Sequence, residues 1–331
     1  MNYLKNIKLV NFRNHDDFEL NLDNKITLIV GENGSGKTSV LEAVYICLNG
    51  KSFRAVDGEI LKHGREFYRI ELEYIDGRKE VIIFDGGRKS IDFQGEKSIR
   101  LKKKHKYPTI LFLPEDLHLV EASPSSRRNY FDKFFSQINE KYYNSLLRYN
   151  RALKQRNEIL KQANIGTSSL FSWNIILAKY GAEISKIRRD LIEEINKSIT
   201  DYYRKIADNK DEVVIKNTDL INENEYLNNL ENNIQKDIIL GYTSFGIHRD
   251  DFKFYFNKKM AAWSASRGEL RSLILALKFI EADLVYEKLH KRAIILLDDV
   301  FSELDQKRQA SLIKNFKDNQ IILTSVDEIE I

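Results

Sequence analysis

The 331-residue sequence contains only one cysteine, Cys47, together with 3 prolines and 15 glycines. One thiol can form neither an internal disulfide nor the cysteine cluster of a structural zinc site, and this favours a reducing compartment. None of the 6 histidines is paired with another at the spacing of metal ligands. So little proline and glycine excludes collagen-like and low-complexity chains. No stretch approaches the roughly 18 apolar residues of a membrane span, and the N-terminus has no secretory apolar core. We therefore expect a cytoplasmic protein with no membrane segment.

Neither sign of charge is in large excess. Lys and Arg number 53 against 49 Asp and Glu, which gives a net charge of +4, and this bias alone does not indicate a nucleic-acid binder. Residues 97–106 (KSIRLKKKHK) include six Lys and Arg residues and no acidic residue. Such a run could contact phosphates, although a solvated loop or strand edge is the commoner explanation. Because 42% of the residues are hydrophobic, the chain can bury a substantial core.

The N-terminal part of the sequence alternates between strand and helix patterns. Short apolar strands are predicted at residues 4–10 and 25–30, and a glycine-rich turn then leads into an apolar helix pattern over residues 38–48. Residues 67–93 show a period of two, broken by Asp-Gly and Gly-Gly turns, which predicts an antiparallel meander. All three prolines, Pro108, Pro114 and Pro124, follow close together and indicate a boundary.

The pattern after the prolines is helical. Apolar residues spaced by three or four predict two long amphipathic helices, at 131–160 and 177–206, with a turn at 163–169 that would let them pack antiparallel. The C-terminal elements are predicted as a strand at 252–256, a helix at 266–281, a strand at 293–297, a helix at 305–316 and a strand at 320–324. We therefore predict a head built from residues 1–110 and 241–331, with a mainly helical arm, residues 111–240, inserted between them.

Residues 31–38 (GENGSGKT) match the P-loop pattern, and they have the required strand before them and helix after them. In such a loop, backbone N–H groups surround phosphate oxygens, Lys37 reaches the β- and γ-phosphates, and the Thr38 hydroxyl can ligate Mg²⁺. The sequence therefore predicts ATP and Mg²⁺ as cofactors. The nucleotide-binding residues that it predicts here are Gly31, Asn33, Gly34, Ser35, Gly36, Lys37, Thr38 and Ser39.

A second acidic motif follows the apolar strand pattern 294–297. Asp298 is predicted to hold the metal ion, and Asp299 to orient or deprotonate the attacking water, which makes Lys37, Asp298 and Asp299 the catalytic candidates. Because the P-loop and these acids lie near opposite ends of the chain, a large insertion must separate them. We therefore predict an α/β fold of the ABC-type P-loop ATPase head, a mixed sheet with an antiparallel β subdomain, carrying an inserted α-helical arm.

Ser266 and Gly268 open the predicted helix that precedes the acidic motif. In an ABC ATPase, a serine and the N–H groups at this helix N-terminus contact the γ-phosphate of nucleotide held by the opposite subunit. The same residues also form a capping box, with Glu269 reaching back to Ser266, and the two interpretations are compatible. Residues 302–305 (SELD) lie where an ABC D-loop belongs, which favours the signature interpretation and adds Asp305 to the nucleotide site.

The sequence resembles the RecF family of bacterial recombination-repair ATPases along nearly its whole length. The general ABC motifs occur in many ATPases, so the proline-flanked and His-Arg-Asp-Asp segments are the specific part of the resemblance. Two positions depart from the family pattern: Ile247 stands where Pro is usual, and Glu269 with Leu270 where Gln-Gln is common. The matching segments are residues 9–14 (LVNFRN), 42–43 (EA), 51–54 (KSFR), 112–117 (FLPEDL), 123–128 (SPSSRR), 155–157 (QRN), 246–251 (GIHRDD) and 296–305 (LLDDVFSELD).

The resemblance implies a function in gap repair. ATP would bind between two copies of the chain in an ATP-dependent homodimer with weak, DNA-stimulated ATPase activity, acting at junctions of single- and double-stranded DNA. The implied partners are RecO and RecR, with RecA as the protein to be loaded. Arg13 would approach the nucleotide phosphates, and Thr324 or Ser325 lies near the ABC switch position.

Two other functions share the nucleotide motifs. A transporter's nucleotide-binding subunit is disfavoured by the long insertion and by Asp298-Asp299 in place of Asp-Glu, and an architectural SMC-like protein by the lack of room for a long coiled coil. Arg127 and Arg128 could contact DNA phosphate or be solvated. The cluster His248, Arg249 and Asp250 could lie at an interface or form a structural, salt-bridged turn.

Overall fold

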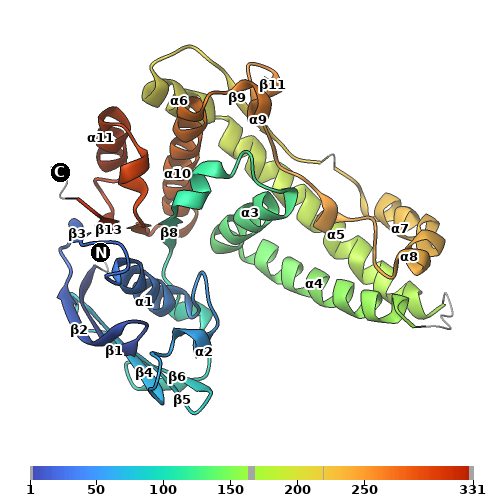
Figure 1. Ribbon diagram of the computed structural model, residues 1–331. Coiled ribbons are helices and arrows are strands. Elements are labelled where there is room, and N and C mark those ends of the chain that lie inside the picture. Colours follow the sequence, from blue (N-terminus) through green and yellow to red (C-terminus); the bar gives the residue numbers. More distant parts are fainter. Residues whose placement is uncertain (1–2, 163–167, 219, 328–331) are drawn as a thin grey trace. The chain divides into compact units, whose positions relative to one another are not determined.

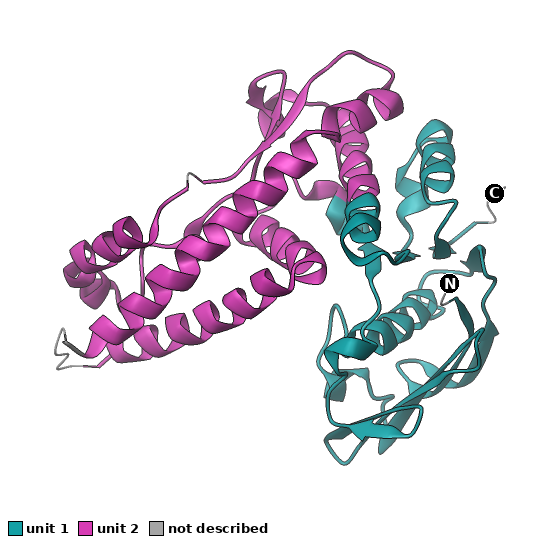
Figure 2. Ribbon diagram, turned by 180° about the vertical axis from the view of Figure 1, so that it is seen from behind, with its two compact units in different colours: residues 1–116, 281–331 teal, residues 117–280 magenta. Residues whose placement is uncertain are grey.

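The computed structural model describes residues 3–162, 168–218 and 220–327 (Figure 1). The chain divides into two compact units, coloured separately in Figure 2. Unit 1 consists of residues 1–116 and 281–331, and unit 2 of residues 117–280. Unit 1 thus contains both ends of the chain, and unit 2 is the segment between them.

Unit 1 contains a six-stranded antiparallel sheet with the strand order β2-β1-β4-β5-β6-β7. Its alternating pattern places one row of buried side chains across four strands, in which Leu9 pairs with Ile70, Ile70 with Ile82, and Ile82 with Ile91. β2 was not predicted, because most of its residues are polar and the strand is largely exposed. The strands are β1 (Leu4–Phe12), β2 (His15–Asn21), β4 (Phe67–Tyr74), β5 (Lys79–Asp85), β6 (Arg88–Phe93) and β7 (Glu96–Ser98).

A four-stranded parallel sheet forms the second layer of unit 1, in the order β3-β13-β12-β8. Every residue of its two central strands is buried, as expected for a parallel sheet covered on both faces. β8 was not predicted either, because it is a short strand between two prolines that sequence reasoning read as a boundary. The strands are β3 (Ile26–Val30), β8 (Thr109–Phe112), β12 (Ile294–Leu297) and β13 (Gln320–Ser325).

Helix α1 (Lys37–Asn49) packs into the core that the two sheets share. Ten of its 13 residues are buried, and its apolar side chains belong to one cluster with residues of the antiparallel sheet and with Leu296 and Ile322 of the parallel sheet. Burial from both sides explains why the helix has no polar face. The remaining helices of unit 1 are α2 (Asp57–Ile60), α11 (Gln306–Asn315) and the 3₁₀ turns at Lys103–His105, Pro114–His118 and Val300–Glu303.

Unit 2 is mainly helical, and α4 and α5 lie side by side in both views (Figures 1 and 2). Its three-stranded sheet has the order β11-β10-β9. The helix α10 begins in unit 2 and continues into unit 1. The elements are α3 (Pro124–Ile138), α4 (Glu140–Leu160), α5 (Ser168–Asn196), α6 (Ile199–Ala207), β9 (Val213–Lys216), α7 (Glu223–Asn232), α8 (Ile234–Leu240), a 3₁₀ turn (Ile247–Arg249), β10 (Lys253–Phe256), β11 (Lys259–Met260), α9 (Ala261–Ser264) and α10 (Arg267–Leu289).

Each of the two long helices predicted from the apolar spacing is divided in the structure. The first is split between α3 and α4 at Asn139, whose side chain accepts a hydrogen bond of 2.9 Å from the Tyr142 N–H and so caps α4. The second is split between α5 and α6 at residues 197–198. The predicted turn at 163–169 lies largely outside the described residues.

Residues 241–280, expected to belong to the head, lie in unit 2. β10 pairs with β9 of unit 2. Two ion pairs, Arg127 with Asp251 at 2.8 Å and Arg188 with Asp250 at 3.0 Å, attach the same segment to α3 and α5. The apolar pattern of residues 252–256 indicates a strand but does not show which sheet it joins, so the boundary was placed too early.

Candidate functional site

The glycine-rich loop connects the end of β3 to the first residue of α1. Gly36 has φ of 100° and caps the helix, a conformation that favours glycine. A side chain there would also collide with its neighbours, because an added Cβ would lie 2.5 Å from Nε2 of His15 and 2.7 Å from Oδ1 of Asn14. The sequence GENGSGKT therefore folds locally into a helix N-terminus with an exposed backbone loop, the geometry that binds phosphate.

The turn between β1 and β2 supports this loop. The Asn14 amide donates a hydrogen bond of 3.2 Å to the carbonyl of Gly34, and a ring nitrogen of His15 lies 3.2 Å from the carbonyl of Gly36. Sequence reasoning missed both residues. Their signal was weak, since Asn14 ends the segment LVNFRN, which was read only as part of a family pattern.

Lys37 turns back over the loop. Its ammonium donates hydrogen bonds of 2.6 Å to the carbonyl of Gly31 and 3.1 Å to the carbonyl of Glu32. The charge is therefore held directly over the loop, where the predicted phosphate-binding role requires it.

A chain of hydroxyl and carboxylate groups connects the P-loop with the acidic motif. β3 and β12 both lie next to β13, so the side chain of Thr324 at the end of β13 lies between them. The hydroxyls of Thr38 and Thr324 donate hydrogen bonds of 2.8 and 2.9 Å to Oδ1 of Asp298. Burial raises the pKa of Asp298, and the two hydroxyls lower it, with a net upward shift. The Thr38 hydroxyl and the Asp298 carboxylate are oxygen donors of the kind that Mg²⁺ prefers, so this pair fits the ion.

Asp299 differs from its neighbour. Its φ is 49°, and its backbone N–H donates a hydrogen bond of 2.9 Å to Oγ1 of Thr324. Within the described part of the chain, its buried Oδ1 has no hydrogen-bond partner. The residue lines the same pocket as the P-loop. Asp299 thus lines the pocket and carries a carboxylate oxygen that the described protein groups do not use, as a residue that positions or deprotonates water requires.

The pocket itself has a volume of about 540 Å³. It brings together most of the predicted P-loop residues with Arg13 and Asp299, whereas Gly31 and Ser35 are not among its lining side chains. It also includes residues that sequence reasoning did not assign to the site. The full lining is Arg13, Asn14, Asn33, Gly34, Gly36, Lys37, Thr38, Ser39, Arg54, Glu59, Leu61 and Asp299.

Arg13 lies at the wall of the pocket, but its guanidinium is bound to protein groups. It makes two hydrogen bonds to the carboxylate of Glu42, of 2.9 and 2.7 Å, and one of 2.9 Å to the carbonyl of Glu59. Arg54 and Ser52 bind the same carboxylate at 2.9 and 2.6 Å. Burial raises the pKa of Glu42 and these hydrogen bonds lower it, with a net downward shift. In the sequence, the sign of this cluster is Glu42 itself, an acidic residue among the apolar residues of α1.

Ser266 caps α10. Its backbone N–H donates a hydrogen bond of 2.6 Å to the Glu269 carboxylate, and its Oγ accepts a longer one of 3.4 Å from the Glu269 N–H. The capping box expected from the sequence is therefore formed. Gly268 lies in the first turn, and its carbonyl accepts 3.1 Å from the Ser272 hydroxyl. Ser266 and Gly268 belong to unit 2, whereas the P-loop and both acids belong to unit 1.

Asp305 caps α11 in unit 1. Its carboxylate accepts a hydrogen bond of 2.9 Å from the Arg308 N–H and forms an ion pair with the Arg308 side chain. The hydroxyl of Ser302 donates 2.7 Å to the carbonyl of Asp299, which ties this segment to the acidic motif. The segment 302–305 thus continues directly from the acids, in the place of the predicted D-loop.

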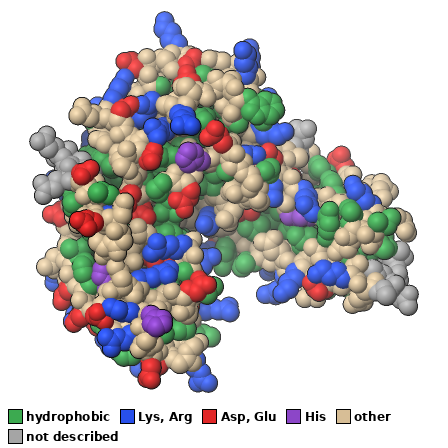
Figure 3. All heavy atoms as spheres, in the orientation of Figure 1, with side chains coloured by type: hydrophobic (Ala, Val, Ile, Leu, Met, Phe, Trp, Pro, Cys, Tyr) green, Lys and Arg blue, Asp and Glu red, His purple; other side chains and the backbone are tan. Residues whose placement is uncertain are grey.

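The basic run at residues 97–106 is partly neutralised by one neighbouring acid. The carboxylate of Glu96 binds Lys102, Lys104 at 2.8 Å and His105 at 2.7 Å, and these contacts hold the pKa of Glu96 below its usual range. On the face shown in Figure 3, Lys and Arg side chains are mixed with Asp and Glu. This arrangement favours a solvated surface segment over a dedicated phosphate site.

The His-Arg-Asp-Asp cluster holds unit 2 together. Ring nitrogens of His248 lie 2.7 Å from the Tyr149 hydroxyl and 3.0 Å from the carbonyl of Thr243, and burial lowers the pKa of His248 to about 4. Asp251 receives two hydrogen bonds, of 2.8 and 2.9 Å, from Arg127. The geometry therefore favours the salt-bridged turn, and it gives Arg127 a structural partner.

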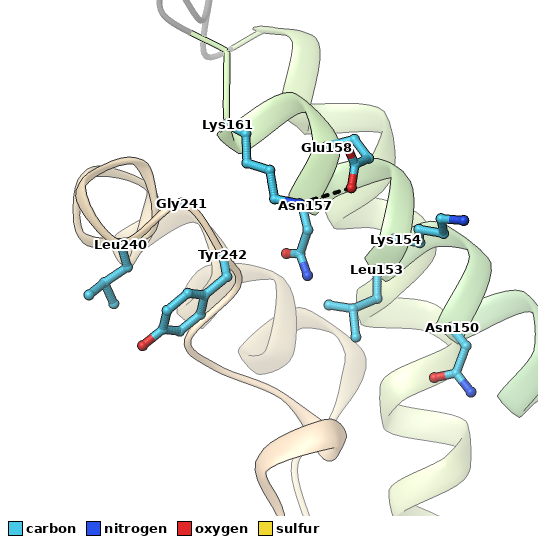
Figure 4. Close-up of a pocket in the computed structure, with 9 residues that line it drawn as sticks. All are labelled: Asn150, Leu153, Lys154, Asn157, Glu158, Lys161, Leu240, Gly241 and Tyr242. Atoms are coloured by element: carbon cyan, nitrogen blue, oxygen red, sulfur yellow. Dashed lines mark hydrogen bonds and ion pairs between the residues drawn. The ribbon is translucent and has the colours of Figure 1, made fainter.

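Unit 2 has a separate pocket of about 630 Å³, between one face of α4 and residues 240–242 (Figure 4). The side chains of Leu153, Asn157 and Tyr242 lie at its walls. No residue of the predicted nucleotide site lines it. Across the described ranges, no group of three or more His, Cys, Asp or Glu is arranged to hold a metal ion, and no helix has the length and apolarity to cross a bilayer.

Comparison with known proteins gives a consistent result. A family model described as an AAA domain matches residues 6–322. The chain is 36% identical to the DNA replication and repair protein RecF of Clostridium novyi, over 99% of this chain and 94% of that protein. It is 34% identical to RecF of Clostridium perfringens, over 97% of this chain and 92% of that protein.

Solved structures agree with these sequence relatives. The recombination mediator protein RecF with ATP, of the RecFOR pathway, superposes with a TM-score of 0.87 and 31% identity, over 100% of this chain and 93% of that one. An Smc head bound to part of ScpA gives a TM-score of 0.54 at 16% identity and shows likeness of fold alone.

Proposed function

Because the chain belongs to the RecF family of DNA replication and repair proteins, we propose that it binds ATP with Mg²⁺ in the P-loop pocket and uses the nucleotide to control its binding to DNA. The observation that carries this proposal is the hydrogen-bonded chain from Thr38 through Asp298 to Thr324. It brings two motifs from opposite ends of the sequence together in one unit.

The residues of the pocket take separate roles. Gly31, Asn33, Gly34, Ser35 and Gly36 would offer loop groups to the phosphates, with Lys37 as the countercharge. Thr38, with Ser39 beside it, and Asp298 would hold Mg²⁺, which supplies charge neutralisation on the phosphate oxygens. Asp299 would accept a proton from, or orient, the attacking water, because its buried Oδ1 is not otherwise used.

We further propose that the complete site needs two copies of the chain. Ser266 and Gly268 of one copy would approach the nucleotide held by Lys37 of the other, with Asp305 beside the same interface. The hydroxyl of the cap serine, Ser266, accepts only a long hydrogen bond of 3.4 Å, so it can turn toward a phosphate at small cost. Hydrolysis would be slow and DNA-stimulated, and it would open the dimer.

Arg13 has a supporting role in this proposal. Its guanidinium is held by Glu42 and by the carbonyl of Glu59 at the pocket wall. From this position it adds positive potential near the phosphates, and a move toward them would have to break the Glu42 pair.

The proposed DNA target is a gap or a junction between single- and double-stranded DNA in the cytoplasm. The related RecF structures are assigned to the RecFOR pathway by name. This name supports RecO and RecR as the proposed partners of this chain, and the proposal adds RecA as the protein that is loaded.

Binding to a fluorescent gapped duplex, measured by anisotropy with and without a non-hydrolysable ATP analogue and Mg²⁺, tests the proposal. The analogue should tighten binding by wild type by tenfold or more, and Lys37→Ala should lose this increase, because nucleotide binding requires the ammonium. Lys104→Ala, in the basic run, is the matched control and should keep it. Equal DNA binding with and without nucleotide would contradict the proposal.

A further inference from the structure

The most exposed large aromatic side chain among the described residues is that of Trp263, which is 84% exposed. It lies in α9, three residues before Ser266. Tryptophan is seldom left in water without a function, and it is the residue type most enriched at the energetic centres of protein interfaces. Because it is exposed so close to Ser266, the proposed signature serine, we expect Trp263 to contact a partner.

The backbone around Trp263 is well held, so its exposure is not that of a loose loop. The Ala265 N–H donates 3.0 Å to the carbonyl of Ala261, and the Ser264 hydroxyl donates 2.9 Å to the carbonyl of Met260. Met260 itself pairs with Tyr255 in the β10–β11 hairpin. The indole is therefore presented from a fixed platform, which lowers the entropic cost of binding through it.

A second exposed apolar side chain lies next to the nucleotide pocket of unit 1. Val56 is 66% exposed and caps the short helix α2. Its N–H donates 3.3 Å to the Glu59 carboxylate, and Glu59 lines the pocket together with Arg54 and Leu61. Val56 thus places an exposed apolar side chain beside residues that line the pocket.

We propose that Trp263 of one copy packs on Val56 of a second copy when ATP brings the two together. This inference rests on the proposed dimer, in which Ser266 reaches the nucleotide of the other copy. Three residues span at most about 11 Å, so Trp263 must then lie at the edge of the same pocket. By two-fold symmetry each dimer has this contact twice.

The alternative occupant of an exposed tryptophan is a DNA base, because bases stack on aromatic side chains. The position of Trp263 favours the protein partner. Trp263 shares a rigid segment with Ser266, and the side chain of Val56 supplies an exposed apolar surface for it.

Fluorescence tests the burial of Trp263. The sequence has 2 tryptophans, so Trp173→Phe leaves Trp263 as the sole indole, and Trp263→Phe leaves Trp173 as the matched control. With a non-hydrolysable ATP analogue, Trp263 emission should shift to the blue and acrylamide quenching should fall at least twofold, while Trp173 should not respond. Trp263→Ser should weaken ATP-dependent dimerisation by tenfold or more and leave nucleotide binding by the monomer unchanged.

Crosslinking tests the identity of the contact. The only natural thiol, Cys47, is buried, so single cysteines can be added without a reactive background. We expect a short bismaleimide to give covalent dimers when Val56→Cys and Trp263→Cys proteins are mixed with the ATP analogue, and none from either protein alone. Ile239→Cys, equally exposed at 84% on α8, replaces Trp263→Cys as the control and should not crosslink.

The outcomes separate this inference from the proposed function. An ATP-dependent dimer in which Trp263 stays exposed and the mixed crosslink is absent would overturn the inference and leave the dimer intact. Protection of Trp263 by DNA alone, without nucleotide, would overturn it in favour of base stacking. A wild-type protein that never dimerises with ATP would overturn the proposed shared site first, and this inference with it.

Discussion

At the residue scale, unit 1 places four acids in environments of different character. Glu42 accepts hydrogen bonds from Arg13, Arg54 and Ser52, and one oxygen of Asp298, Oδ1, accepts hydrogen bonds from two threonine hydroxyls. Oδ1 of Asp299 has no hydrogen-bond partner among the residues that the structure describes. Glu80, the second residue of β5, is fully buried and, in the described part of the chain, neither of its carboxylate oxygens has a hydrogen-bond partner. The environment of each carboxylate, more than its residue type, therefore distinguishes these four acids.

Glu80 makes stability depend on pH. Burial raises its pKa to about 8 from an ordinary 4.5, with Lys89 opposing the shift. The folded state therefore holds a proton that the unfolded state releases, so this stabilisation is complete below about pH 4.5 and is lost as pH rises to about 8. We expect wild type to lose up to about 1.4 kcal/mol per pH unit relative to Glu80→Gln across this window. Urea unfolding at pH 5.5, 6.5 and 7.5 measures it.

The exposed Glu66→Gln is the control for this titration, and its stability should follow wild type at every pH. A Glu80→Gln protein whose pH profile also parallels wild type would show that Glu80 does not hold the proton.

Asp299→Asn should separate binding from hydrolysis. The amide keeps the shape but cannot accept a proton from water, so we expect hydrolysis to fall by about 100-fold or more while ATP-dependent association remains. Asp298→Asn is the informative comparison, since loss of the proposed metal ligand should weaken nucleotide binding itself. A phosphate-release assay with nucleotide affinity measured in parallel distinguishes the two. Full activity of Asp299→Asn would remove it from the mechanism.

At the scale of elements, the sequence predicts the helices and strands that have a regular apolar pattern and does not predict those that depart from it. The P-loop, its flanking strand and helix, and the strand before Asp298 follow from apolar runs and glycine spacing. The apolar period continues through Asn139, so the cap that divides α3 from α4 could not be read from it. β2 is polar because it lies at a sheet edge, and β8 is short and enclosed by prolines. The partner of Arg13 depends on tertiary packing and was not predictable either.

Gly246 lies where several elements of unit 2 meet, and its substitution should lower the free energy of unfolding strongly. Its φ is 136°, and an added Cβ would lie 2.4 Å from the Tyr226 hydroxyl and 2.5 Å from that of Tyr149. These tyrosines come from α7 and α4, so the close approach at Gly246 joins both helices to the segment 246–251. We expect Gly246→Ala to lower the free energy of unfolding by about 3 kcal/mol, from backbone strain and overpacking together.

Gly241→Ala is the matched control for this cost. Gly241 also has a positive φ, of 70°, but an added Cβ there would have nothing within 4 Å. Its substitution should therefore cost only the backbone term, about 1 kcal/mol. Chemical denaturation of both variants measures the difference, and equal losses would show that packing on the two tyrosines contributes nothing.

At the scale of the whole molecule, the two ends of the chain build one unit and the middle builds the other. β3 pairs with β13, and Gln320 exchanges hydrogen bonds of 2.8 Å with both backbone groups of Leu4, so the N- and C-terminal segments fold together. The P-loop and the acidic motif consequently share unit 1, while Ser266 lies in unit 2. The proposed sharing of one nucleotide by two copies would bring unit 2 of one copy to unit 1 of the other.

The most direct test of that shared site is hydrolysis by a mixture of two inactive variants, Lys37→Ala and Ser266→Arg, with dimer formation followed by sedimentation. Each should be inactive alone. Their mixed dimer pairs the intact P-loop of one copy with the intact Ser266 of the other, so an equal mixture should recover about one quarter of the wild-type rate. A mixture that hydrolyses ATP no faster than its separate components would contradict the account, because each chain would then depend only on its own Lys37 and Ser266.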